Sequence, residues 1–250
     1  MITVRNLYKS FQGKEVLHDI STTFHPGRCS LIIGASGSGK TVLLKTIVGL
    51  HDPDQGEVDY DGVLFNRLKQ EERKTIRQKI GMLFQGSALF DFATVEENIR
   101  FPMDFFTDWS AAQKKERIDF CLNRVNLLNA SKKYPSELSG GMQKRVGIAR
   151  AIALNPKYLF CDEPNSGLDP QTALRIDALI AEITQEFGIT TIVNTHDMNS
   201  VLEIGDQISF ISQGCLRWEG KRDEIFQSDC QELNDFVFTS QLAKQIWNKR

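Results

Sequence analysis

The spacing of apolar and polar residues changes several times along the chain of 250 residues. In residues 1–30, apolar and polar positions tend to alternate between turns marked by glycine and proline, which predicts a small antiparallel sheet. Four short runs are largely apolar without alternation, as in strands buried on both faces of a parallel sheet: residues 30–33, 81–85, 158–162 and 190–195.

From residue 86 to about residue 155 the apolar residues recur mainly at helical spacing. Thr94 is followed three residues later by Glu97, which predicts a capping box at a helix start. Ser110 and Ser139 precede two further helical patterns. After residue 223 the pattern is again helical but polar.

This alternation of strands and helices predicts an α/β fold with a mainly parallel sheet and right-handed crossovers. We expect an α/β core made of residues 1–85 and 156–222, which includes the antiparallel β-subdomain. Residues 86–155 would form an inserted α-helical subdomain, and residues 223–250 a C-terminal helical tail.

Composition narrows the classes of protein. With 30 basic and 32 acidic residues the net charge is −2, so nothing global indicates a nucleic-acid partner. The five cysteines are scattered, which is typical of reduced thiols in a cytosolic protein, most of them in the core. No apolar run approaches the roughly 20 residues that span a bilayer, and the first residues do not resemble a signal peptide. We therefore expect a soluble chain that a partner holds at any membrane.

Residues 31–44 carry the clearest chemical motif. Gly34, Gly39, Lys40 and Thr41 have the spacing G-x-x-x-x-G-K-[ST] of a phosphate-binding P-loop. Glycines let the backbone turn successive N–H groups toward a phosphate, and the helix that follows points its positive end at the same phosphate. Lysine adds a charge, and the threonine hydroxyl is a Mg²⁺ ligand. The nucleotide would lie on the whole loop and helix start: Gly34, Ala35, Ser36, Gly37, Ser38, Gly39, Lys40, Thr41 and Val42.

Two acidic residues follow the apolar run at residues 158–161. Asp162, at the end of a buried strand, is placed to hold Mg²⁺ in a P-loop protein. Glu163 is one residue further and is a candidate general base for water. The plain alternative is a strand end that happens to be acidic.

Ser139, Gly140 and Gly141 form a second glycine loop at a helix start, again with a hydroxyl and free N–H groups for a phosphate. Because the first loop already holds a nucleotide, this loop predicts a nucleotide shared between two chains. The alternative is a glycine-rich helix cap.

With these motifs in this order, the chain resembles the ATPase subunit of ABC transporters from about residue 2 to residue 220. The resemblance implies a P-loop NTPase (RecA-like) core, ATP and Mg²⁺ as ligands, and ATP hydrolysis coupled to transport. In that family LSGG is the signature loop, so Ser139, Gly140 and Gly141 would contact the γ-phosphate held by the other subunit of a homodimer.

Four further positions match the family motifs. Phe11 would stack on adenine, and Gln85 would sense the γ-phosphate and Mg²⁺ and touch the membrane partner. Asp169 belongs to the loop that communicates across the dimer, and His196 is the switch histidine. Catalysis would then fall to Glu163 with His196, Gln85 and Lys40, and the metal to Thr41, Gln85 and Asp162. Taken singly, each also has a plain structural interpretation.

Residues 84–103 and the signature segment look like the lipid-handling, Mla-type branch that works with MCE proteins. Met142 and Lys144 depart from the commoner LSGGQ-x-QR, and Asn165 replaces the usual threonine or alanine. This resemblance implies a phospholipid or related cargo and a position on the cytoplasmic face of the inner membrane. The alternatives are a small solute or lipoprotein as cargo, or a nucleotide-dependent scaffold with little turnover.

Integral-membrane permease subunits would dock near residues 85–106, which are rich in phenylalanine. An apolar groove for a permease helix and ordinary helical core are both open interpretations of that segment. An MCE-type substrate-binding protein and a small cytoplasmic accessory subunit are further candidate partners. The tail, with Phe236, Leu242, Ile246 and Trp247, would pack on this chain, on the sister subunit or on the accessory protein.

Overall fold

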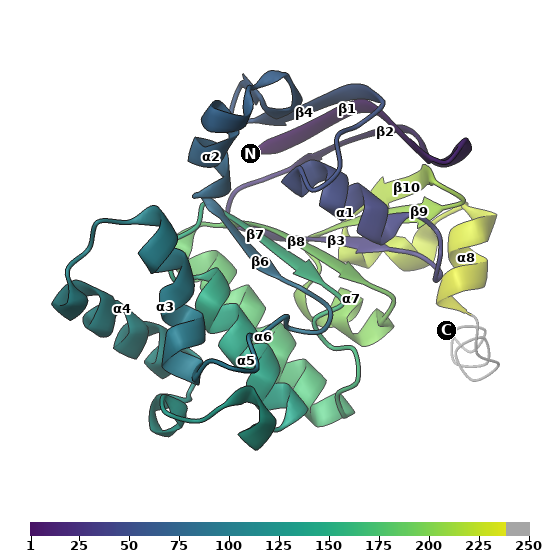
Figure 1. Cartoon of the computed structure of the whole chain (residues 1–250). Helices are drawn as coiled ribbons and strands as arrows, with labels where there is room; N and C mark the ends of the chain where they lie inside the picture. Colours follow the sequence, from purple (N-terminus) through teal and green to yellow (C-terminus); the bar gives the residue numbers. More distant parts are fainter. Residues whose placement is uncertain (239–250) are drawn as a thin grey trace.

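The computed structural model describes residues 1–238, which form two sheets and a helical arm (Figure 1). The tail residues Leu242, Ile246 and Trp247 lie outside the described residues, so the prediction for them stays open. Three of the five cysteines, Cys29, Cys121 and Cys161, are buried and free, as the composition predicted.

The smaller sheet is antiparallel, as the alternation near the N-terminus predicts. Its spatial order is β2 (Lys14–Phe24), β1 (Ile2–Phe11), β4 (Gln55–Tyr60) and β5 (Val63–Leu64).

The larger sheet has six strands and is mainly parallel, which confirms the predicted fold class. Its order is β10 (Cys215–Gly220), β9 (Gln207–Ser212), β3 (Arg28–Ile33), β8 (Thr190–Thr195), β7 (Tyr158–Asp162) and β6 (Ile80–Leu83). Only the hairpin of β9 and β10 is antiparallel.

Eight α-helices and four 3₁₀ turns complete the described chain. The helices are α1 (Lys40–Val48), α2 (Gln70–Arg77), α3 (Val95–Phe106), α4 (Ala111–Arg124), α5 (Gly140–Ala151), α6 (Pro170–Phe187), α7 (Met198–Ile204) and α8 (Gln231–Val237). The 3₁₀ turns are η1 (Phe65–Arg67), η2 (Leu128–Ala130), η3 (Pro135–Glu137) and η4 (Arg222–Gln227). No helix within residues 1–238 combines the length and apolarity that crossing a membrane requires.

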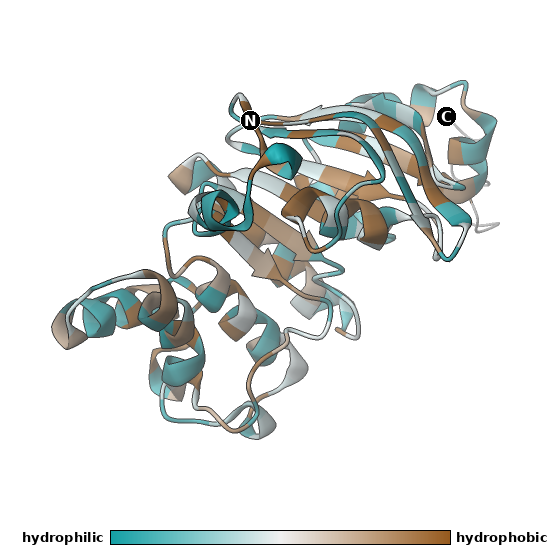
Figure 2. Cartoon of the chain, turned by 45° about the horizontal axis from the view of Figure 1, so that its top comes forward, coloured by the Kyte–Doolittle hydropathy of each residue, from teal (hydrophilic) through white to brown (hydrophobic). Residues whose placement is uncertain are grey.

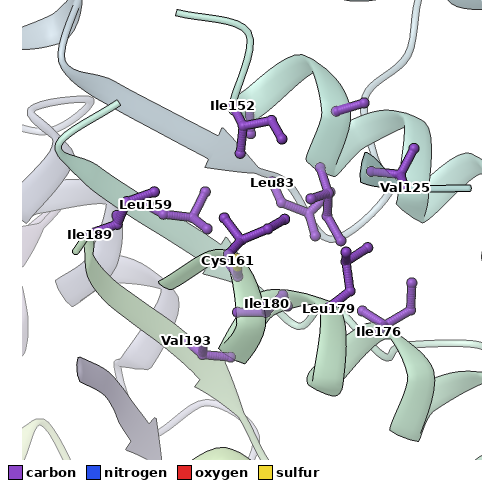
Figure 3. Close-up of a cluster of buried hydrophobic side chains, with 14 of the residues drawn as sticks. Leu83, Val125, Ile152, Leu159, Cys161, Ile176, Leu179, Ile180, Ile189 and Val193 are labelled. Carbon is purple, nitrogen blue, oxygen red and sulfur yellow. The ribbon is translucent and has the colours of Figure 1, made fainter. Parts of the chain in front are cut away.

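Alternate side chains along the strands of the larger sheet pack into two separate hydrophobic clusters. On β3, Ile32 packs with Leu43 of α1 and with residues of the smaller sheet. Its neighbours Leu31 and Ile33 face the other way, into the cluster that contains Ile180 of α6. Figure 3 shows that cluster, and Figure 2 shows hydrophobic residues concentrated in the central strands. The smaller sheet and α1 therefore cover one face, and α5 and α6 cover the other.

The helical arm begins later than the sequence pattern indicates. Residues 86–94 form turns and bends, with Ser87 and Ala88 at positive φ, and α3 starts only at Val95, directly after Thr94, the cap residue of the predicted capping box. The two arms of that box are hydrogen bonds of 2.7 Å from Thr94 N to Glu97 Oε2 and 3.4 Å from Glu97 N to Thr94 Oγ1. The buried Asn98 amide bonds to the backbone of Phe90 and Ala93, which competes with helix formation in these turns.

Candidate functional site

Four parallel strands of the larger sheet end at one edge, in the order β3, β8, β7 and β6. The P-loop follows β3, His196 follows β8, Glu163 follows β7 and Gln85 follows β6. Ligands of α/β sheets bind outside such carboxyl ends. Residues that lie far apart in the sequence are therefore brought to one edge.

At two positions, Gly34 and Gly39, the conformation of the P-loop requires glycine. A Cβ on Gly34 would lie 2.1 Å from the carbonyl oxygen of Ile211, which no side chain tolerates. Gly39, the cap of α1, has φ of 108°, and its Cβ would meet Leu17 and Val16 at 3.0 and 3.1 Å. The loop is tied down by a 2.9 Å hydrogen bond from Gly214 N to the carbonyl oxygen of Ser38.

Lys40 lies folded across this loop. Its Nζ donates to the carbonyl oxygens of Gly34 at 2.7 Å and Ala35 at 3.0 Å. Burial lowers the pKa of the Lys40 ammonium, while the nearby carboxylates of Glu163 and Asp162 oppose that shift. A buried ammonium that folds back onto two loop carbonyl oxygens is suited to an anionic ligand that would replace them.

Asp162 and Thr41 meet, as the magnesium prediction requires. Thr41 Oγ1 donates to Asp162 Oδ1 at 3.2 Å, and Asn194 Nδ2 donates to the same oxygen at 3.1 Å. A hydroxyl and one carboxylate are a donor set that suits Mg²⁺ shared with water and phosphate oxygens. Within residues 1–238 no cluster of three or more His, Cys, Asp or Glu side chains forms a protein-only metal cage. The residues present therefore fit a metal that arrives with a nucleotide.

Glu163 and His196 also meet. His196 Nδ1 lies 2.9 Å from Glu163 Oε2 and 3.0 Å from Oε1. The Glu163 side chain is 14% exposed, and its backbone φ is 48°, a left-handed conformation that is strained for a residue with a side chain. A hydrogen bond of 3.0 Å from Glu163 N to the carbonyl oxygen of Asn194 supports this conformation. Such strain concentrates at functional sites.

Gln85 is exposed two residues beyond β6. Its carbonyl oxygen accepts a hydrogen bond from Lys144 Nζ, and the carbonyl oxygen of Glu163 lies 3.3 Å from the same atom. In the described part of the chain no hydrogen bond joins the Gln85 side chain to Thr41 or Asp162. Its role as a metal ligand therefore stays a prediction.

The second glycine loop lies elsewhere. Ser139 is exposed and caps α5, since its Oγ accepts from Met142 N at 3.3 Å. Gly141 packs so closely on α6 that a Cβ would lie 2.5 Å from Thr172 Cγ2. The helices that follow the two loops cover opposite faces of the larger sheet, α1 on one and α5 on the other. Among residues 1–238 no hydrogen bond or ion pair joins residues 139–141 to the P-loop.

Two other predicted nucleotide contacts are also exposed. Asp169 caps α6 by accepting from Thr172 N at 3.0 Å and Thr172 Oγ1 at 2.6 Å. Phe11 ends β1 and is 39% exposed, with its ring 5.2 Å from that of His51 at 76°. Exposure of this ring disfavours the core-aromatic alternative and leaves a face for stacking.

Sequence reasoning missed Asn194, which supports both Asp162 and Glu163. The available signal was an amide within the otherwise apolar and threonine-rich run TTIVNT. It also treated Lys144 only as a departure from a motif, although the ammonium contacts the carbonyl oxygens of both Gln85 and Glu163.

Known proteins are similar to this chain over most of its length. A family model described as ABC transporter matches residues 17–166. The methionine import ATP-binding protein MetN of Carboxydothermus hydrogenoformans is 41% identical over 249 residues, which cover 98% of this chain and 74% of that protein. MetN of Haemophilus influenzae is 40% identical over 93% of this chain and 68% of its own.

Solved structures of ATP-binding cassettes are similar throughout. A dimeric post-hydrolysis state of the cassette MJ0796 bound to ADP and Pi has a TM-score of 0.82 at 33% identity, over 89% of this chain and 99% of that one. CbiO1 of Clostridium perfringens, part of the ABC transporter complex cbiONQ, has a TM-score of 0.85 at 27% identity, over 98% of both chains.

Proposed function

The chain belongs to the ABC transporter ATP-binding family and is an ATPase, and from that premise we propose that it works as a homodimer with two shared ATP sites. One observation carries this proposal. Within one chain the P-loop, Asp162, Glu163 and His196 form a connected centre, whereas the signature serine is exposed and apart from them. A second copy completes each site by placing its Ser139 over the first copy's nucleotide.

In this proposal each group has a separate task. Lys40 and the loop N–H groups bind the β- and γ-phosphates, and Phe11 stacks on adenine. Thr41 and Asp162 would hold Mg²⁺, which neutralises developing charge on the phosphates. Glu163, held by His196, accepts the proton of the attacking water. Gln85 reports the γ-phosphate to the membrane partner.

The variant Glu163→Gln tests the assignment of the base. It keeps the side chain's size and a hydrogen bond to His196 but removes the proton acceptor, so phosphate release should fall roughly 100- to 1,000-fold. ATP-bound dimers should accumulate and appear in size-exclusion chromatography with MgATP. The matched control is Glu186→Gln, which removes only a surface ion pair with Arg124. Turnover retained in Glu163→Gln would overturn the assignment.

The cargo we propose is a small solute such as methionine. The relatives with about 40% identity are named methionine import proteins, and this favours the small-solute alternative over the lipid cargo that residues 84–103 predicted. Their similarity also gives no support for an MCE-type partner. The ATPase family likewise counts against the scaffold alternative.

A lipid cargo remains the second candidate because of a specific apolar surface. Phe92, which is 83% exposed, lies within residues 84–103, the segment that resembles the lipid-handling branch, and Phe105, which is 65% exposed, follows that segment. Purification of the native complex from its membrane separates the two candidates. A solute receptor together with ATP turnover stimulated by methionine supports the first, whereas an MCE-type protein and stimulation by phospholipid support the second.

The permease is proposed to dock beside Gln85, which would place the chain peripherally on the cytoplasmic face of the inner membrane. A groove there is lined by Phe84, Phe90, Phe101, Pro102, Phe106 and Arg150. This segment was predicted to be either a groove for a permease helix or ordinary helical core, and the two faces of α3 match one interpretation each. Val95, Ile99 and Met103 are buried in the core, while Phe101 is 41% exposed on the groove side.

A further inference from the structure

Lys144 lies on α5, the helix that begins beside the exposed Ser139. Its side chain is buried, and the residue is only 5% exposed. Nζ donates to the carbonyl oxygen of Gln85 and lies 3.3 Å from the carbonyl oxygen of Glu163. Because β6 and β7 are paired in parallel, with Leu83 opposite Cys161, these two carbonyls belong to adjacent loops at the catalytic edge.

Burial of this ammonium is unfavourable by itself. Desolvation lowers the pKa of Lys144, and the opposing interactions with Cys161, Glu163 and Asp162 only partly compensate. A lysine has three donors on one atom, so it can bridge two carbonyl groups that have no donor of their own to offer each other. The two bridged residues lie 59 residues before and 19 residues after Lys144 in the sequence, respectively.

Glu163 needs such support. Its left-handed backbone persists only if the surroundings hold it in place. The N–H of Glu163 is held by Asn194 and the carboxylate by His196. The carbonyl oxygen of Glu163 accepts from Ser166 N at 3.2 Å within its own turn, and from Lys144 Nζ at 3.3 Å, the contact that comes from the signature helix.

We propose that Lys144 is a positioning residue that fixes the spacing between the Gln85 loop and Glu163 and links both to the signature helix. The inference rests on the roles proposed above for these two residues. Movement of α5, which a nucleotide of the other subunit contacts through Ser139, is passed to the base and to the γ-phosphate sensor through one ammonium group. Lys144 does not touch the nucleotide.

The test compares variants of the full chain in MgATP hydrolysis. Lys144→Met keeps the length and apolar stem but removes both hydrogen bonds, so kcat should fall about 10- to 50-fold because the base is misplaced. The KM for ATP should stay within about twofold, since the P-loop is unchanged. Lys144→Gln restores a donor without the charge and should recover kcat to within about threefold of the wild type.

Arg117→Met is the matched control. Arg117 also donates to two backbone carbonyls, of Ile152 at 2.6 Å and Ala153 at 3.0 Å, but these lie at the far end of α5. This control should lower the melting temperature and leave kcat unchanged. If Lys144→Met does not fold, Lys144→Ala is measured in the same way, with the same expected loss of kcat and unchanged KM.

Two results would overturn the inference. The first is a Lys144→Met kcat within twofold of the wild type while Glu163→Gln is inactive, which leaves the proposed function intact. The second is a loss of kcat that Lys144→Gln does not recover, together with a melting temperature lowered as in Arg117→Met. Active Glu163→Gln would instead refute the proposed base itself, so the two failures are distinguishable.

Discussion

The two glycine loops of this chain are alike in sequence and opposite in surroundings. Residues 34–41 lie between a buried strand and α1, and Lys40 there is only 6% exposed. Residues 139–141 also start a helix, yet Ser139 and Gly140 are exposed. The first loop is connected through Thr41 to the carboxylate of Asp162. Within residues 1–238, the side-chain hydrogen bond of Ser139 stays inside the cap of α5. The P-loop thus lies in a connected centre while the signature loop lies apart from it, and this difference is the basis of the proposed homodimer.

The largest losses of activity are expected when one residue in each glycine loop is replaced and the two variants are compared. Lys40→Met should lower ATP affinity and turnover about 1,000-fold, because it removes the buried cation. Ser139→Asp keeps a helix cap but places a negative charge against the other subunit's γ-phosphate, so turnover should fall about 100-fold. Binding of a fluorescent ATP analogue by the Ser139→Asp monomer should stay within about twofold of wild type. Equal losses of binding in the two variants would refute the comparison.

Mixing the two inactive variants should restore part of the phosphate release, which is a smaller change but a specific test of shared sites. A heterodimer has one site built from two intact loops, the P-loop of the Ser139→Asp chain and the signature loop of the Lys40→Met chain. With random pairing and independent sites, an equal mixture should recover about a quarter of wild-type phosphate release. Activity no higher than the mean of the separate variants would exclude shared sites.

Replacing one glycine of each loop by alanine tests how tightly the two loops are packed. Gly34→Ala brings a Cβ to 2.1 Å from a carbonyl oxygen and should destabilise the protein by about 2 kcal/mol. Gly140→Ala has only Leu168 at 3.6 Å and lies in a helix, so its unfolding free energy should be unchanged or slightly higher. Urea denaturation of both variants measures the difference, and equal losses of stability would contradict it.

The smallest expected effect concerns α6, the helix against which Gly141 packs. Asp177 on this helix is 1% exposed, and burial raises its pKa to about 6, while Ser200 and Asn165 oppose that shift. Because the pKa of this carboxyl is higher in the folded state than in the unfolded state, the protein loses stability as the pH rises from the unfolded-state pKa to about 6. Asp177→Asn should therefore stabilise the protein by about 1 kcal/mol at pH 8 and by less at pH 5. Thermal unfolding at both values measures this, with the exposed Asp223→Asn as control, and an equal gain at both would refute the assignment.

Much of the candidate site was predictable because its motifs are local. The P-loop spacing, the acidic pair after a buried strand and the LSGG loop each occupy a few consecutive residues. In the same way, the strands follow from alternation in the smaller sheet and from continuous apolar runs in the larger one, and the start of α3 follows from Thr94 with Glu97. The turns at residues 86–94 were less predictable, because the buried Asn98 side chain, rather than local periodicity, sets their backbone.

The sequence by itself determined the order of the motifs and the residues that we predict to bind a nucleoside triphosphate. Only the tertiary structure decided that Asn194 supports Asp162 and Glu163 and that Lys144 joins the loops of Gln85 and Glu163. Such contacts depend on which strands are neighbours in the sheet and on which face each helix packs, and those relations are not local. The same packing places the helices that follow the two glycine loops on opposite faces of the larger sheet.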